Sequence, residues 1–110
     1  MMLPNGDRAV VDIRKLRDYC LSPTHPVGKH KARVFSSVLG MGLDHAEQLR
    51  EILLEAARTN EAEAGRQDQY GQRYVVECLV AGPRGSARIL SVWIVLATED
   101  FPRLVTCYVL

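Results

Sequence analysis

The sequence lacks paired cysteines and long apolar runs. Its three cysteines, Cys20, Cys78 and Cys107, are too widely spaced to form a CxxC pair, so we expect three buried thiols in a reducing compartment. The longest apolar run, residues 92–97, is far shorter than the ~20 residues of a membrane-spanning helix. The first residues show no basic segment followed by an apolar one, which is the pattern of a secretory signal. These absences predict a cytoplasmic protein with no membrane partner.

Several enzyme motifs are also missing. There is no GxSxG nucleophile elbow, no GxxxxGK[ST] phosphate loop and no GxGxxG fingerprint. This argues against a serine hydrolase, a nucleotide kinase or a dinucleotide enzyme, and we expect no cofactor. His25 and His30 have no Cys, Asp or Glu at ligand spacing in their loop, so we expect no metal site.

The composition is that of an ordinary globular domain. With 110 residues, 47% hydrophobic and 25% charged, the chain fits one domain over residues 1–110. The net charge is only +1, so attraction to nucleic acid must come from local clusters of cations. Such a cluster lies between Arg14 and Arg33, while acidic residues gather in 44–68. The alternative interpretation is a solvated basic face balanced by an acidic one.

Apolar residues at helical spacing predict three helices in the first half of the chain. We expect them at 13–21, 29–39 and 45–59. Asp44 and Glu47 have the spacing of a capping box at the start of the third helix.

The second half changes to the two-residue period of strands. We predict strands at 74–80, 87–97 and 104–109, with a further short strand at 9–11 and an exposed polar connection over 60–71. The order predicts an α+β fold, with three N-terminal helices packed on one face of a C-terminal antiparallel meander of three to four strands.

The opposite face of the sheet is expected to be partly open. We predict Ser91, Trp93, Thr106 and Tyr108 there. The rings of Trp93 and Tyr108 suit base stacking, although core packing is the more usual role for a tryptophan with apolar neighbours.

The segment from His25 to Arg33 has the highest density of side chains that can bind a ligand or transfer a proton. His25 and His30 flank a stiff loop with Pro26 and Gly28 that leads into a helix. A helix N-terminus with imidazole and ammonium groups suits a phosphate. The alternative is a proline-rich surface turn with capping side chains.

Metal-free RNA cleavage through the 2′-hydroxyl needs a base, an acid and cations that stabilise the developing charge. The predicted catalytic set is His30, Lys31, Arg73 and Thr106, and the predicted substrate-binding set is His25, Lys29, Arg33 and Tyr108. We expect the catalytic residues to meet around one anion pocket.

Six blocks of the sequence resemble an uncharacterised bacterial family. They are 3–6 (LPNG), 15–19 (KLRDY), 25–35 (HPVGKHKARVF), 70–74 (YGQRY), 93–95 (WIV) and 102–106 (PRLVT). The family includes small free-standing proteins and C-terminal domains of polymorphic toxins. Its toxin members are placed with the barnase–EndoU–colicin–RelE-like ribonucleases, which have N-terminal helices before a small antiparallel sheet.

The resemblance implies roles for four residues, His30, Lys31, Arg73 and Thr106. His30 is replaced in many toxin-domain relatives that keep the Lys-Ala pair. The implied partners are RNA, including tRNA, and a small antitoxin or immunity protein.

The sequence hypothesis is therefore a metal-independent endoribonuclease that acts as the toxin of a toxin–antitoxin-like pair. The alternative is a non-catalytic module that binds protein or RNA through the same basic surface.

Overall fold

The computed structural model describes all 110 residues and has an α+β architecture. The helical half comprises η1 (Gly6–Arg8), α1 (Ile13–Lys15), η2 (Leu16–Cys20), α2 (Lys29–Val34), η3 (Phe35–Leu39), η4 (Leu43–His45) and α3 (Ala46–Thr59). The sheet follows as β1 (Ala62–Asp68), β2 (Gly71–Ala81), β3 (Ser86–Leu96) and β4 (Pro102–Val109), antiparallel in the order β1-β2-β3-β4. No helix is long and apolar enough to cross a membrane.

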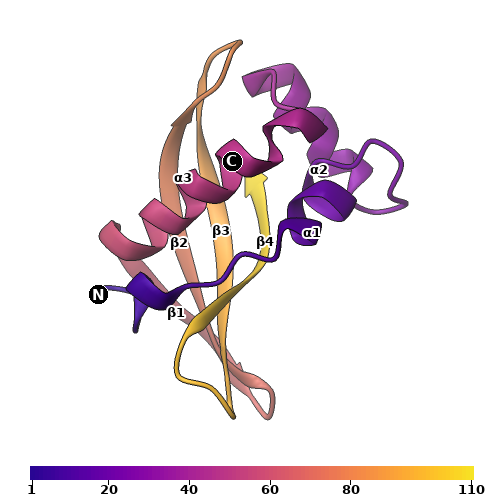
Figure 1. Ribbon diagram of the computed structural model, residues 1–110. Helices are drawn as coiled ribbons and strands as arrows, with labels where there is room; N and C mark the ends of the chain where they lie inside the picture. The colour runs from indigo at the N-terminus through magenta and orange to yellow at the C-terminus, as the bar shows by residue number, and fades with distance from the viewer.

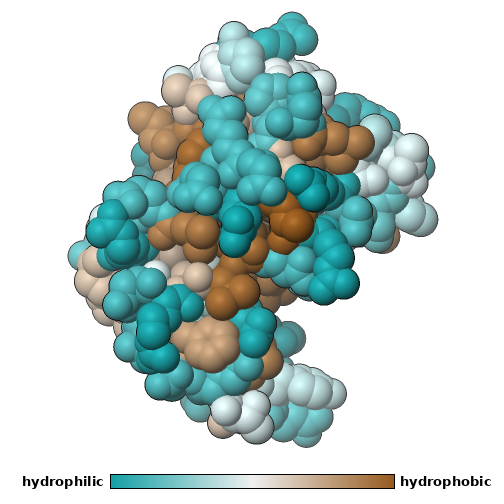
Figure 2. Space-filling view, in the orientation of Figure 1, coloured by the Kyte–Doolittle hydropathy of each residue, from teal (hydrophilic) through white to brown (hydrophobic).

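The helices cover one face of the sheet, as the sequence predicts. Figure 1 shows α3 crossing in front of the strands, with α1 and α2 beside the edge strand β4. The core between these layers includes Leu16, Phe35, Leu53 and Trp93, each fully buried. Hydrophilic side chains cover most of the outer surface of the helices, with hydrophobic patches between them (Figure 2).

Helix boundaries follow from local chemistry. The Asp12 carboxylate accepts the backbone N–H of Arg14 and caps α1. Gly40 adopts the left-handed conformation (φ 70°) that ends η3. The capping box predicted from Asp44 and Glu47 is wrong, because η4 precedes α3 and the His45 Nδ1 atom accepts the N–H of Gly42 instead.

Two strand predictions are wrong. Residues 62–68, expected within an exposed connection, form the edge strand β1, which pairs with β2 although six of its seven residues are exposed. The strand expected at 9–11 is reduced to a single bridge between Val10 and Arg103, because the chain leaves at once for α1.

The prediction that Ser91 and Trp93 lie on the open face is also wrong. Both are completely buried, and they align across strands with the core residues of β2. The Trp93 indole N–H donates to the Ser91 hydroxyl, which in turn donates to the backbone carbonyl of Val76. This chain of hydrogen bonds satisfies the polar atoms of a buried serine and tryptophan.

Candidate functional site

A cleft of about 620 Å³ lies along β4, where α1, η2 and the loop after η2 meet this strand. It is lined by Asp12, Arg14, Lys15, Asp18, Tyr19, His25, Val105 and Thr106. The lining therefore joins three parts of the chain that are far apart in sequence.

His25 reaches the cleft from a loop that its own side chain holds in place. Its Nδ1 atom accepts the backbone N–H groups of Val27 (3.0 Å) and Gly28 (2.9 Å). Because Nδ1 is an acceptor, the ring proton of the neutral imidazole is assigned to Nε2. Gly28 permits this tight loop, since a Cβ there would overlap the backbone carbonyl of Tyr19. His25 therefore both holds the turn that precedes α2 and presents an N–H donor.

Tyr19 connects His25 to α2. Its ring meets the His25 ring edge-on with 4.8 Å between the centroids. The Lys31 ammonium donates to the Tyr19 hydroxyl oxygen at 3.1 Å and lies 5.0 Å from the ring centroid. Since the lysine supplies that hydrogen, the proton of the Tyr19 hydroxyl is free to be donated to a ligand.

Thr106 is turned into the cleft by a β-bulge. The pairing of β3 with β4 shifts register between Val92 and Trp93, so β4 carries one extra residue there. As a result, the consecutive residues Val105 and Thr106 both line the cleft, whereas side chains of a regular strand alternate between faces. The Thr106 hydroxyl lies 3.7 Å from the thiol of Cys20, which fixes its position from behind.

Two thiols form the buried wall behind Thr106. A hydrogen bond between them lowers the pKa of Cys20 and raises that of Cys107. All three cysteines of the chain are buried and free, as the sequence predicts. Cys20 lies in η2 and Cys107 in β4, so their interaction links two elements that are far apart in the sequence.

The charges in the cleft differ in how they are compensated. Arg14 forms an ion pair with Asp12 at 2.7 Å, and its hydrogen bond lowers the pKa of that carboxyl to about 2. Neither Lys15 nor Asp18 forms an ion pair, although Lys15 attracts Asp12 and Asp18 attracts Arg14 over a longer distance. The cleft thus holds one free cation and one free carboxylate.

The predicted catalytic residues do not all meet. Thr106 lines the cleft and Lys31 contacts it through Tyr19. His30 is exposed on α2 and lies outside the cleft lining. Arg73 lies on β2, two strands away from β4, and its guanidinium binds Asp68 at 3.0 Å.

The predicted substrate-binding residues also separate. His25 lines the cleft, whereas Lys29 and Arg33 line a second groove on α2. Tyr108 pairs with Leu90 and is not part of the cleft lining. Sequence reasoning did not single out Tyr19, although it lies in the block 15–19 that carries the family resemblance.

The family model for a domain of unknown function, DUF6883, matches residues 2–110. The chain belongs to the DUF6883 family. The match spans the helices, the sheet and every residue of the cleft, so the site described here is built entirely from the DUF6883 domain. The comparison with curated proteins finds no match.

Proposed function

We propose that this protein is an endoribonuclease that cleaves RNA through its own 2′-hydroxyl group, without a metal ion. The observation that carries the proposal is the convergence of three donors, from Tyr19, His25 and Thr106, at one cleft beside an unpaired lysine. A phosphodiester offers only acceptor oxygens, so the N–H and O–H donors of these three side chains are complementary to it.

The donors divide into two roles. The Nε2–H of His25 and the hydroxyl of Thr106 bind the non-bridging phosphate oxygens and stabilise their charge as the 2′-oxygen attacks. Lys15, the free cation of the lining, binds an adjacent phosphate. His25 is not the proton acceptor, because its Nδ1 atom is occupied by two backbone N–H groups.

Asp18 and Tyr19 move the protons. The Asp18 carboxylate takes the proton of the 2′-hydroxyl while the bond from O2′ to phosphorus forms. As the bond from phosphorus to O5′ breaks, Tyr19 gives its hydroxyl proton to the leaving oxygen, and the Lys31 ammonium stabilises the resulting phenolate. The products are a 2′,3′-cyclic phosphate and a 5′-hydroxyl, and water returns Asp18 and Tyr19 to their starting states.

A cleavage assay tests this proposal. Purified protein is incubated with total RNA and tRNA in EDTA, and the products are examined for 2′,3′-cyclic phosphate ends. We expect cleavage that Tyr19→Phe slows by about 10²–10⁴-fold, the usual contribution of a general acid. Tyr70→Phe is the matched control, since Tyr70 is exposed in the turn between β1 and β2. Intact RNA at high protein concentration, or equal rates for both variants, would refute the proposal.

A non-catalytic RNA-binding module is the second candidate. It is favoured by one observation, which is that the Nδ1 atom of the only imidazole in the cleft is committed to the turn before α2. A 2′-O-methyl RNA distinguishes the two functions. Binding of this analogue, together with binding but no cleavage of natural RNA, would favour the module.

We propose further that the activity is that of a toxin whose partner is a small antitoxin or immunity protein. The support is the family resemblance given above. Induced expression in bacteria is expected to arrest growth, and Tyr19→Phe to relieve the arrest. Undisturbed growth at high levels of the wild-type protein would count against a toxin.

A further inference from the structure

Positive charge without a carboxylate partner is concentrated around α2. Nine of the fourteen lysines and arginines form ion pairs with carboxylates. The remaining five are Lys15, Lys29, Lys31, Arg33 and Arg84. Lys15 and Lys31 belong to the cleft along β4, so the proposed RNA site leaves three unpaired cations without a role.

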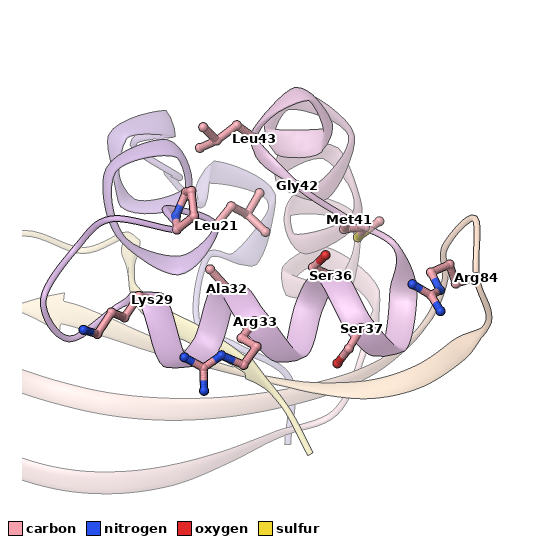
Figure 3. Close-up of a pocket in the computed structure, with 11 residues that line it drawn as sticks. Leu21, Lys29, Ala32, Arg33, Ser36, Ser37, Met41, Gly42, Leu43 and Arg84 are labelled. Carbon is pink, nitrogen blue, oxygen red and sulfur yellow. The ribbon is translucent and has the colours of Figure 1, made fainter.

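Those three cations line a separate groove of about 590 Å³. Lys29 and Arg33 come from α2, and Arg84 comes from the turn between β2 and β3 (Figure 3). No carboxylate lines this groove. Three cations and no carboxylate give the groove a positive potential, which is complementary to an acidic ligand.

The remainder of the groove combines aliphatic side chains with the hydroxyl groups of Ser36 and Ser37. Leu21, Ala32 and Met41 contribute to its floor, and Leu43 stands at its rim with 48% of its surface exposed. Figure 3 shows Ala32 on the side of α2 that faces Leu21. A ligand that fills this groove must therefore bring apolar groups as well as negative charge.

The backbone keeps the groove open. Gly40 turns the chain back over η3, and the backbone N–H of Arg84 donates to the carbonyl of Leu39, which fixes the β2–β3 turn beside it. The stem of Arg84 lies against Gly40, where a Cβ would overlap it. At Gly42 a Cβ would make an ordinary contact with the Asp44 carboxylate, at 3.6 Å, so this position does not obstruct the groove. The groove is thus a preformed feature of the fold.

We propose that this groove binds an acidic, amphipathic segment of a partner protein, with aliphatic side chains on the floor and carboxylates against Lys29, Arg33 and Arg84. An amphipathic helix in an apolar groove is a common mode of peptide recognition. RNA fits less well, because no aromatic side chain lines the groove and bases would have no ring to stack on. The inference is independent of the cleavage activity, which belongs to the other cleft.

Selection from a displayed library of random 16-residue peptides tests the inference. We expect the enriched peptides to combine Asp or Glu with Leu, Ile or Met at spacings of three and four residues. Their binding should weaken at least tenfold for Arg33→Glu combined with Arg84→Glu. Arg58→Glu combined with Arg66→Glu is the matched control, because these arginines lie outside the groove with 54% and 71% of their side chains accessible. Thermal unfolding confirms that each variant is folded.

NMR then locates the peptide on the protein. Amide NMR signals of Ser36, Met41 and Leu43 should shift when an enriched peptide is added. The inference is overturned if the enriched peptides are not acidic, if no enriched peptide depends on the two arginines, or if the shifts map elsewhere. It is also overturned if a single-stranded oligonucleotide shifts these signals and the peptides do not, since the groove would then be a nucleic-acid surface.

Discussion

Replacing His25 separates the two roles that the structure gives to this residue. Its Nδ1 atom accepts two backbone N–H groups, whereas its Nε2–H is available to a ligand in the cleft. In His25→Ala both are lost. In His25→Asn the side-chain oxygen can take the place of Nδ1, so the turn is retained, while the donor at the position of Nε2 is lost because the amide is shorter than the ring.

The expected magnitudes follow from the burial of the two N–H groups. Gly28 is buried, so its N–H loses its partner without access to water, whereas the N–H of the exposed Val27 can be solvated again. His25→Ala should therefore lower the free energy of unfolding by about 1–2 kcal/mol, in the range for a buried donor left without its partner. For a domain of this size that is a fall in Tm of roughly 4–10 °C. His25→Asn should recover most of this loss.

Urea unfolding followed by the fluorescence of Trp93 measures both variants, because this fully buried residue is the only tryptophan. RNA binding should be weakened in His25→Asn as much as in His25→Ala. The reasoning is refuted if the asparagine variant is as unstable as the alanine variant, because the loop would then not depend on the Nδ1 acceptor.

Three further predictions concern stability. Ser91→Ala should cost about 1–3 kcal/mol and change the emission of Trp93, because the buried indole N–H loses its acceptor; unchanged urea midpoints would contradict this. Gly71→Ala should cost about 1–3 kcal/mol, because φ is 153° and the facing strand leaves no room for a Cβ; unfolding melts measure it, with an unshifted Tm as the contrary result. Since the folded pKa of Asp12 is lowered to about 2 by the hydrogen bond from Arg14, its contribution is present above the ordinary value near 3.8 and is lost as pH falls through 2. The stability difference between wild type and Asp12→Asn should shrink over that interval, and a difference independent of pH would contradict the assignment.

The helical half of the fold is predictable because its signals are local. The apolar spacing acts within a few residues, and the structure has helical segments in all three predicted ranges. The Asp12 cap and the left-handed Gly40 act over the same short range. β1 was missed because an edge strand with one buried residue in seven carries no alternating apolar pattern. Backbone pairing with β2 holds this segment as a strand, although its own sequence does not indicate one.

The faces of β3 could not be assigned from the sequence because both carry apolar residues. Ile89 and Trp93 face the helices, while Leu90 and Val92 lie on the other side. Ser91 looked like a surface residue, yet its hydroxyl has both a donor and an acceptor partner in the core. Polarity alone does not reveal such a satisfied buried hydroxyl.

The candidate site was predictable only in the part that comes from one continuous segment of the sequence. The segment from His25 to Arg33 was identified from its own residue types, and two of its members, His25 and Lys31, do reach the cleft region. The approach of Thr106 depends on a bulge, and the separation of Arg73 depends on strand order. Neither the bulge nor the strand order can be recognised from a local sequence pattern. The predicted catalytic set therefore combined residues that lie apart in the structure.

The most direct test of the account is an NMR titration of the intact protein with a short 2′-O-methyl RNA, which can bind but cannot be cleaved. We predict that the largest shifts fall on Tyr19, Gly28 and Thr106, around the cleft along β4. Shifts centred instead on Arg73, or no shifts at any RNA concentration, would contradict the assignment of this cleft as an RNA site.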